Sequence, residues 1–130
     1  MPKALIEPHC HPRRPTLDVV KALAERFDTT FTATAIRFVD LTEESCAVVW
    51  SENGRVKWSI PGRNFYPTVS FGRTLSGLSH AGDAFRGKPL PRDPQLVPGH
   101  TWVDRDGDLW EQSTYFRTLG AVLTLLWRES

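Results

Sequence analysis

The dipeptide Asn53-Gly54 limits the fold of this chain more than any other feature of the sequence. A type I′ turn needs positive φ angles at both central positions, and Asn-Gly adopts them most readily. Alternating segments at 46–51 and 55–60 flank the dipeptide, as they do in an antiparallel hairpin. The two-residue turn predicts cross-strand neighbours, namely Glu52 with Arg55, Ser51 with Val56, Val49 with Trp58 and Ala47 with Ile60. On that register one buried face carries Val49, Val56, Trp58 and Ile60.

A second dipeptide of this kind, Asp106-Gly107, predicts another hairpin between residues 100–105 and 108–117. Its register places Val103 opposite Trp110 and Trp102 opposite Glu111. Leu119-Gly120 offers a further turn before the apolar run 121–127. The periodicity of that run fits a buried helix as well as a strand. We favour a strand, because a short turn after a strand usually returns the chain antiparallel.

Helical spacing precedes the strands. Thr16 is a good N-cap for a helix over 17–27, whose apolar face carries Leu17, Val20, Ala24 and Phe27. The polar break 28–30 can cap a second helix, with Phe31, Ala35, Phe38 and Val39 on one side. Residues 1–15 hold four prolines, which predict an extended arm.

Residues 61–99 differ in composition from the rest of the chain, with six prolines and six glycines. Most of this stretch is expected to be loop, and long loops in compact domains are often functional, so a ligand-covering lid can sit here. One short helix is predicted near 77–86, with Ser76 as its cap and Gly87 as its stop. Its apolar face would carry Leu78, Ala81 and Phe85.

These patterns predict an α+β fold with three parts: an arm at 1–15, a helix pair at 16–43 and an antiparallel sheet domain at 44–130. With 130 residues, the chain fits one compact domain, and 40% apolar residues can fill a core. The net charge of +1 indicates no large basic field for nucleic acid. No apolar run reaches the roughly 20 residues that span a bilayer, and no signal peptide is evident. Because Cys10 and Cys46 are too few for a disulfide framework, we expect a cytoplasmic protein.

Catalytic motifs are missing from this sequence. It contains no H-E-x-x-H, no G-x-S-x-G, no Walker loop and no G-x-G-x-x-G. The most metal-like cluster, His9-Cys10-His11, cannot close a tetrahedron alone and suits adventitious binding better. Ser79 and His80 are expected to be ordinary polar residues at a helix start. The sequence therefore predicts no catalytic residue, no metal site and no cofactor.

A polar run at 111–115 neighbours the apolar last strand. Buried polar side chains must be paired, so these either satisfy one another, which we favour, or bind a small molecule. The five Trp residues all fall in predicted strands, where they form core or line a pocket. The candidate ligand-binding residues are Trp58, Trp102, Trp110, Glu111, Ser113 and Tyr115.

The helix pair can also be interpreted as a helix-turn-helix. Its second helix would present Thr32, Thr34 and Arg37 to a DNA major groove. Phosphate contacts would come from Arg13, Arg14, Lys21 and Arg26. Paired helices are also common packing units, and no third supporting helix is evident. The candidate partners are thus a small molecule, another protein, DNA or a second copy of the chain, but no membrane.

Several segments, taken in order, resemble the C-terminal part of ImmA/IrrE family proteins. They are Thr16–Phe27, Thr32–Arg37, Cys46–Trp50, Gly54–Trp58, Leu109–Ser113 and Leu123–Trp127. Members of that family join a zinc metallopeptidase-like region to a helix-turn-helix segment and a GAF-like domain, and they control stress or mobile-element genes through repressors. The resemblance implies a helical segment at 16–42 and a GAF-like sensor domain at 44–130. Because the peptidase motif is absent, the resemblance implies a non-catalytic regulatory or sensor domain.

Overall fold

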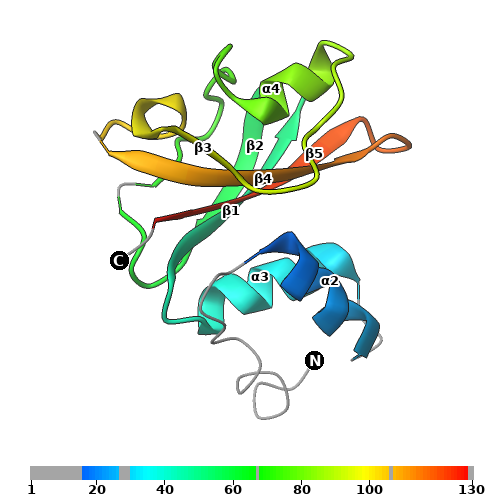
Figure 1. Ribbon diagram of the computed structural model, residues 1–130, viewed down its shortest axis with the longest axis vertical. Helices are drawn as coiled ribbons and strands as arrows, with labels where there is room; N and C mark the ends of the chain where they lie inside the picture. The colour runs from blue at the N-terminus through cyan, green and yellow to red at the C-terminus, as the bar shows by residue number, and fades with distance from the viewer. Residues whose placement is uncertain (1–15, 27–29, 67, 106, 129–130) are drawn as a thin grey trace.

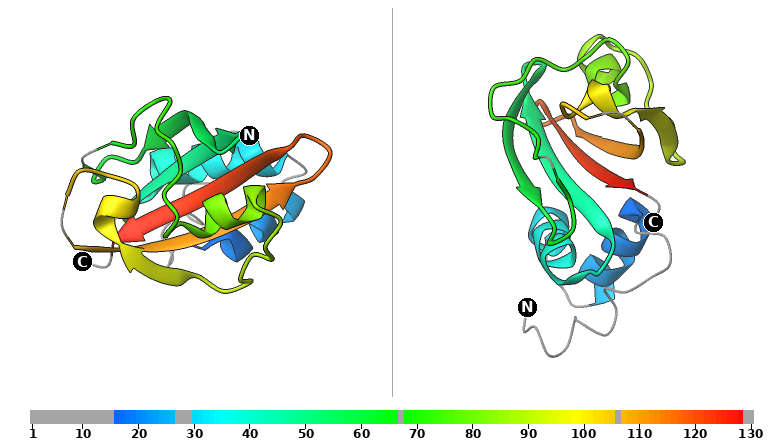
Figure 2. Two further views of the ribbon diagram at one scale, coloured as in Figure 1. Left: turned by 90° about the horizontal axis from the view of Figure 1, so that it is seen from above. Right: turned by 90° about the vertical axis from the view of Figure 1, so that its left-hand side faces the viewer.

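The chain is an α+β protein, as predicted. The structure, a computed structural model, describes residues 16–26, 30–66, 68–105 and 107–128. Within these residues, two N-terminal helices lie on one face of a five-stranded antiparallel sheet. A short helix and the irregular segments lie on the other face (Figure 1 and Figure 2). The predicted arm at 1–15 falls outside the described residues.

The helix pair consists of α2 (Leu17–Arg26) and α3 (Phe31–Leu41). Thr16 Oγ1 accepts a hydrogen bond of 3.3 Å from the backbone N–H of Val19, which confirms the predicted cap. Thr30 caps α3 in the same way, accepting from the N–H of Ala33 at 3.2 Å. Side-chain oxygens thus satisfy N–H groups that a helix leaves without internal partners.

The sheet has the strand order β2-β1-β5-β4-β3. The strands are β1 (Ser45–Glu52), β2 (Arg55–Pro61), β3 (Gln95–Pro98), β4 (Asp108–Phe116) and β5 (Ala121–Arg128). The run after Gly120 is therefore a strand, as favoured, and Gly120 turns the chain with a φ of 61°. β5 lies at the centre, and all its residues except Arg128 are buried.

The sheet separates two apolar cores. The first lies under the helix pair and includes Phe38, Val48 and Leu125. The second lies under α4 (His80–Phe85) and its flanking segments, and includes Trp102, Leu109 and Leu126. Because side chains alternate along a strand, each residue of the inner strands contributes to one core or the other.

The first hairpin has the predicted turn but a different register. Asn53 and Gly54 have φ angles of 53° and 74°, and Glu52 pairs with Arg55 as expected. Beyond Ser51 the register shifts, because Lys57 is an extra residue that forms a β-bulge. Trp50 therefore pairs with Trp58, and Val48 pairs with Ile60. The predicted pairs Val49–Trp58 and Ala47–Ile60 are wrong.

The bulge also moves side chains from one core to the other. Val49 and Val56 remain together in the core under α4. Trp58 and Ile60 pack instead against the core under the helix pair. A shift of one residue reverses the direction of every later side chain, so the predicted common face is wrong from Trp58 onward.

The second predicted hairpin is also wrong. The partner of β4 is β3, in which Gln95 pairs with Glu111 and Pro98 pairs with Asp108. A wider connection joins the two strands and begins with a 3₁₀ helix, η2 (Gly99–Thr101). The N–H of Gly99 donates to the carbonyl of Gly107 at 2.6 Å, which closes this loop. Trp102 and Val103 follow η2 and pack into the core from the loop.

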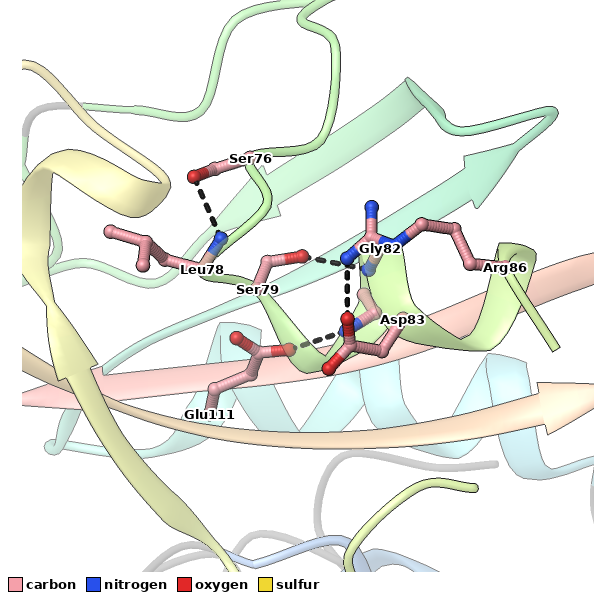
Figure 3. Close-up of polar contacts among 8 residues, drawn as sticks. Ser76, Leu78, Ser79, Gly82, Asp83, Arg86 and Glu111 are labelled. Atoms are coloured by element: carbon pink, nitrogen blue, oxygen red, sulfur yellow. Dashed lines mark hydrogen bonds and ion pairs between the residues drawn. The ribbon is translucent and has the colours of Figure 1, made fainter. Parts of the chain in front are cut away.

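The short helix α4 starts later than predicted. Ser79, rather than Ser76, is its N-cap, and its Oγ accepts from the N–H of Gly82 at 2.7 Å (Figure 3). Ser76 Oγ instead accepts from the N–H of Leu78 in the preceding turn. Leu78 is therefore outside the helix and 55% exposed, so its predicted place on the apolar face is wrong. Gly87 follows the helix with a φ of 79°, as expected of a stop.

Candidate functional site

The outer edge of β4 is only half covered. β3 pairs with β4 from Asp108 to Glu111. From Gln112 to Phe116, β4 pairs with β5 alone among the described strands. Strand edges carry backbone N–H and C=O groups that can pair with another chain. This half of β4 is therefore an open edge.

Prolines explain why the chain does not cover this edge itself. Continuing the β3–β4 register would place Pro94 opposite Gln112 and Pro91 opposite Tyr115. Proline has no N–H to donate, and because Pro91 and Pro94 are three positions apart, one of their two nitrogens would face β4 in a continued strand. The segment 88–94 accordingly forms no strand and flanks β4 without a backbone ladder.

At the opposite edge of the sheet, another segment of the chain forms backbone hydrogen bonds with the edge strand β2. Along β2, the N–H of Val56 donates to the carbonyl of Arg73, and the N–H of Gly72 donates to the carbonyl of Val56. Arg55 and Thr74 form an isolated antiparallel bridge. The chain thus covers the start of the β2 edge, at Arg55 and Val56, and leaves the second half of β4 accessible.

A cleft of about 600 Å³ follows the open edge, and we name it the β4 groove. Its walls come from the start of α2, the start of α3, the segment 90–92 and residues 112–116 of β4. A second hollow of about 430 Å³ continues past α4, and the two share Leu90 and Tyr115. Aromatic side chains of Phe31, Tyr115 and Phe116 line the groove beside charged ones. Such a mixture is typical of ligand sites.

Gln112 connects three walls of the β4 groove. Its Oε1 accepts a 2.7 Å hydrogen bond from the N–H of Leu17, the first residue of α2. Its Nε2 donates to Asp18 Oδ2 at 3.2 Å and to the carbonyl of Arg92 at 3.0 Å. The side chain is 4% exposed, so water hardly competes for these bonds. One amide therefore connects the sheet, the first helix and the proline-rich segment.

The charges around the groove are mostly positive. Lys21 and Arg92 line the groove, while Lys88 and Arg117 line the adjoining hollow. All four are exposed, and none forms an ion pair within the described part of the chain. The one acidic residue in the two linings is Asp18. The groove therefore favours an anionic occupant.

The carboxylate of Glu111, the residue before Gln112, is buried on the α4 side of the sheet (Figure 3). Its Oε1 accepts from Trp102 Nε1 at 3.0 Å, and its Oε2 accepts from the N–H of Ala81 at 2.8 Å. Ser113 Oγ donates to the same Oε2 at 3.2 Å and lies 2.7 Å from Thr124 Oγ1. Burial raises the pKa of Glu111, although the bonds from Trp102 and Ala81 oppose the shift. Glu111 and Ser113 are thus paired with protein groups, the alternative that we favoured.

The six candidate ligand-binding residues do not form one pocket. Trp102, Glu111, Ser113 and Tyr115 lie on the α4 side of the sheet. Trp58 and Trp110 pack on the helix-pair side. Of the six, only Ser113 and Tyr115 line the β4 groove. Trp102 follows η2 and is not in a strand, which corrects the expectation that all Trp residues are.

The tryptophans on the helix-pair side form stacked pairs. Trp58 stacks on Trp50 with ring centroids 5.8 Å apart, and Trp50 stacks on Phe116 at 5.7 Å. Phe31 meets Phe116 edge-on at 6.1 Å. Trp110 stacks on Trp127 at 6.3 Å. These rings fill the space between helix pair and sheet, which is the core role considered for them.

The candidate DNA-reading residues differ in how far they are buried. Thr34 is fully buried, and its hydroxyl donates to the carbonyl of Thr30 at 2.7 Å, so its predicted contact with DNA is wrong. Thr32 and Arg37 are half-buried, and Arg37 lies 3.6 Å from Asp40. Arg13 and Arg14 fall outside the described residues. The structure thus brings no complete set of base-reading side chains together.

The remaining features concern a metal site and a membrane span. His9, Cys10 and His11 are not among the described residues. In the described ranges, no three His, Cys, Asp or Glu side chains gather closely enough to hold a metal ion. None of the described helices combines the length and apolar character needed to cross a membrane.

Sequence comparison adds no relative. No protein-family model matches the chain, and no curated protein matches it. Sequence reasoning had singled out Ser113 and Tyr115 but missed the groove beside them. The available signal was the set of prolines at 89, 91 and 94, which prevents a strand next to β4.

Proposed function

We propose that the chain is a cytoplasmic, non-catalytic regulatory domain that binds a ligand or a partner segment in the β4 groove. Binding in the groove changes the position of the helix pair relative to the sheet, and the helix pair acts as the effector surface. The resemblance to the C-terminal part of ImmA/IrrE proteins supports a role in controlling stress or mobile-element genes. The observation that carries the proposal is the set of three bonds made by Gln112 across the groove.

The dimensions and the lining of the groove support binding. A volume of about 600 Å³ lies within the range of known ligand pockets. The polar groups of Asp18, Arg92 and Gln112 face an apolar and aromatic surround, which gives an occupant both affinity and orientation.

The position of Gln112 supports communication. An occupant that accepts from Nε2 must displace the bond to Asp18 or to Arg92, and one that donates to Oε1 shares that oxygen with the N–H of Leu17. Each such bond contributes about 0.5–1.5 kcal/mol, and coupling between sites is typically about 1–3 kcal/mol. A change at one side chain is therefore large enough to shift the position of α2 relative to the sheet.

Backbone NMR tests this proposal. We expect members of a panel of cytosolic metabolites and short peptides to shift the amide signals of residues 112–116 and, with them, those of Phe38 and Val39 in α3, which do not line the groove. Gln112→Ala should retain the shifts in β4 and lose those at Phe38 and Val39. Gln95→Ala is the matched control, because within the described part of the chain its side chain bonds only to the nearby carbonyl of Asp93.

Three results would count against the proposal. The first is a panel that produces no shift along β4. The second is a Gln112→Ala variant that responds in α3 as the unmodified chain does. The third is salt-dependent DNA binding that Arg37→Ala removes, which would support the helix pair as a DNA reader instead.

A further inference from the structure

We infer that the β4 groove binds an extended acidic peptide, which adds a strand to the outer edge of β4 beside residues 112–116. The inference rests on the proposed function and names the chemistry of the partner. It explains three features together: an open strand edge, a track that follows it and an excess of positive charge.

The backbone is the first of these features. Residues 112–116 are strand, yet β5 is their only strand neighbour in the described chain. An added strand would satisfy the outward N–H and C=O groups, as peptides do when they extend a sheet. Five strand residues span about 17 Å, so the edge can pair with about five residues of a partner.

The shape of the site is the second feature. The groove and the adjoining hollow share Leu90 and Tyr115, so together they form a track along β4. It runs from Leu17 and Asp18 at the start of α2 to Arg117 at the end of β4. A long, narrow track beside a strand suits an extended segment better than a compact molecule.

Charge is the third feature. Lys21 belongs to α2 on one side of the sheet, whereas Lys88 follows α4 on the other. Successive side chains of an added strand point to opposite sides. Acidic residues at neighbouring positions of the peptide can therefore meet cations on both sides. Arg92 and Arg117 extend the positive charge along the track.

The prolines keep the site open. Pro91 and Pro94 prevent the segment 88–94 from pairing with β4, so the edge is not filled by the chain itself. Lys and Arg beside an open edge also discourage pairing with other positively charged strands. The arrangement thus selects against nonspecific partners and for an acidic one.

A displayed library of random ten-residue peptides, selected on the full chain, tests the inference. We expect enriched peptides to carry an excess of Asp and Glu and to lack proline at their centre. When added to the chain, an enriched peptide should slow hydrogen exchange of amides within 112–116. The same peptide N-methylated at alternate residues should bind at least tenfold more weakly, because backbone donors are lost.

Charge variants complete the test. Lys21→Ala, Arg92→Ala and Arg117→Ala should each weaken binding about two- to fivefold and reduce its dependence on salt. Lys57→Ala is the matched control, since this exposed lysine lies on β2 at the other edge of the sheet and should leave affinity unchanged.

The outcomes separate this inference from the proposed function. Enriched peptides without acidic bias, or unaffected by N-methylation, would overturn the inference. So would a chain that dimerises through 112–116 and excludes peptides. If metabolites shift both β4 and α3 while no peptide binds, the inference fails and the proposed function stands. If neither metabolites nor peptides shift β4, both fail.

Discussion

The side chain of Glu111 connects α4 and the loop after η2 to the sheet through hydrogen bonds. Replacing Glu111 with glutamine perturbs these bonds. Two donors approach different carboxylate oxygens of Glu111, the N–H of Ala81 and the indole N–H of Trp102. The carboxamide has one oxygen and one NH₂ group. Whichever way it turns, its NH₂ faces one of these donors, which is then left without an acceptor.

The expected loss of stability follows from that mismatch. Glu111 is 1% exposed, so the donor that loses its acceptor cannot form a hydrogen bond with water instead. A buried donor without a partner costs about 1–3 kcal/mol. We expect Glu111→Gln to lower the free energy of unfolding by that amount below pH 4.5, where the contribution of Glu111 is full. Glu25→Gln is the control, because Glu25 is exposed on α2 and should change stability by less than about 0.5 kcal/mol.

The pH dependence has a definite sign. Burial raises the pKa of Glu111 above its ordinary value of 4.5, so the folded chain holds this proton when the unfolded chain has released it. The contribution of Glu111 to stability is therefore full below pH 4.5 and falls as the pH rises toward the folded pKa. One such group changes stability by up to about 1.4 kcal/mol per pH unit. Glutamine does not titrate, so this part of the pH dependence disappears in Glu111→Gln.

Urea unfolding of both proteins between pH 4 and pH 8 measures this effect. The free energy of unfolding of the unmodified chain minus that of Glu111→Gln should fall as the pH rises above 4.5. A difference that stays constant, or grows with pH, would refute the reasoning, because it would mean that the folded state does not favour the protonated carboxyl.

Three smaller predictions concern stability alone. Gly99→Ala should lower the free energy of unfolding by about 3 kcal/mol or more in urea titrations, because a Cβ there would lie 2.7 Å from the carbonyl of Arg105. Gly77→Ala, where a Cβ meets nothing within 4 Å, should change it by less than about 1 kcal/mol. Thr30→Ala should lower the thermal midpoint through the loss of about 1 kcal/mol of capping, and Thr32→Ala should not. Arg37→Ala should alter stability by less than about 0.5 kcal/mol, because its ion pair is largely exposed; a larger loss would show that the pair is structural.

Local signals in the sequence predicted the local structure well. Helical spacing and the caps Thr16 and Thr30 placed the helix pair, and Asn53-Gly54 placed the first turn. These features depend on interactions between residues a few positions apart, so a short stretch of sequence is enough to predict them.

Longer-range features were not predictable in the same way. Asp106-Gly107 looks like a hairpin turn, but the loop that contains it is closed by a bond from Gly99 to Gly107. The bulge at Lys57 lets Trp58 reach the aromatic stack under the helices, a contact that nothing near the turn encodes. Tertiary packing decided both cases.

The candidate site was predicted in part. The polar run in β4 indicated buried partners, and Glu111 and Ser113 have them. The role of Gln112 could not be foreseen, since Leu17 and Arg92 are far from it in sequence. The groove required knowing that β3 stops opposite Glu111.

Filling the β4 groove covalently tests whether its occupancy affects the helix pair, and it does not require the natural occupant. Thr114 lines the groove, and Cys46 is fully buried, so Thr114→Cys in a Cys10→Ser background can be labelled with a maleimide. Thr118→Cys, in the exposed turn before β5, is the control. Hydrogen exchange of α3 at Phe38 and Val39, which do not line the groove, is the measurement. We expect altered exchange there for the label at position 114 but not for the label at position 118. Unchanged exchange for both labels would mean that binding in the groove does not reach the helix pair.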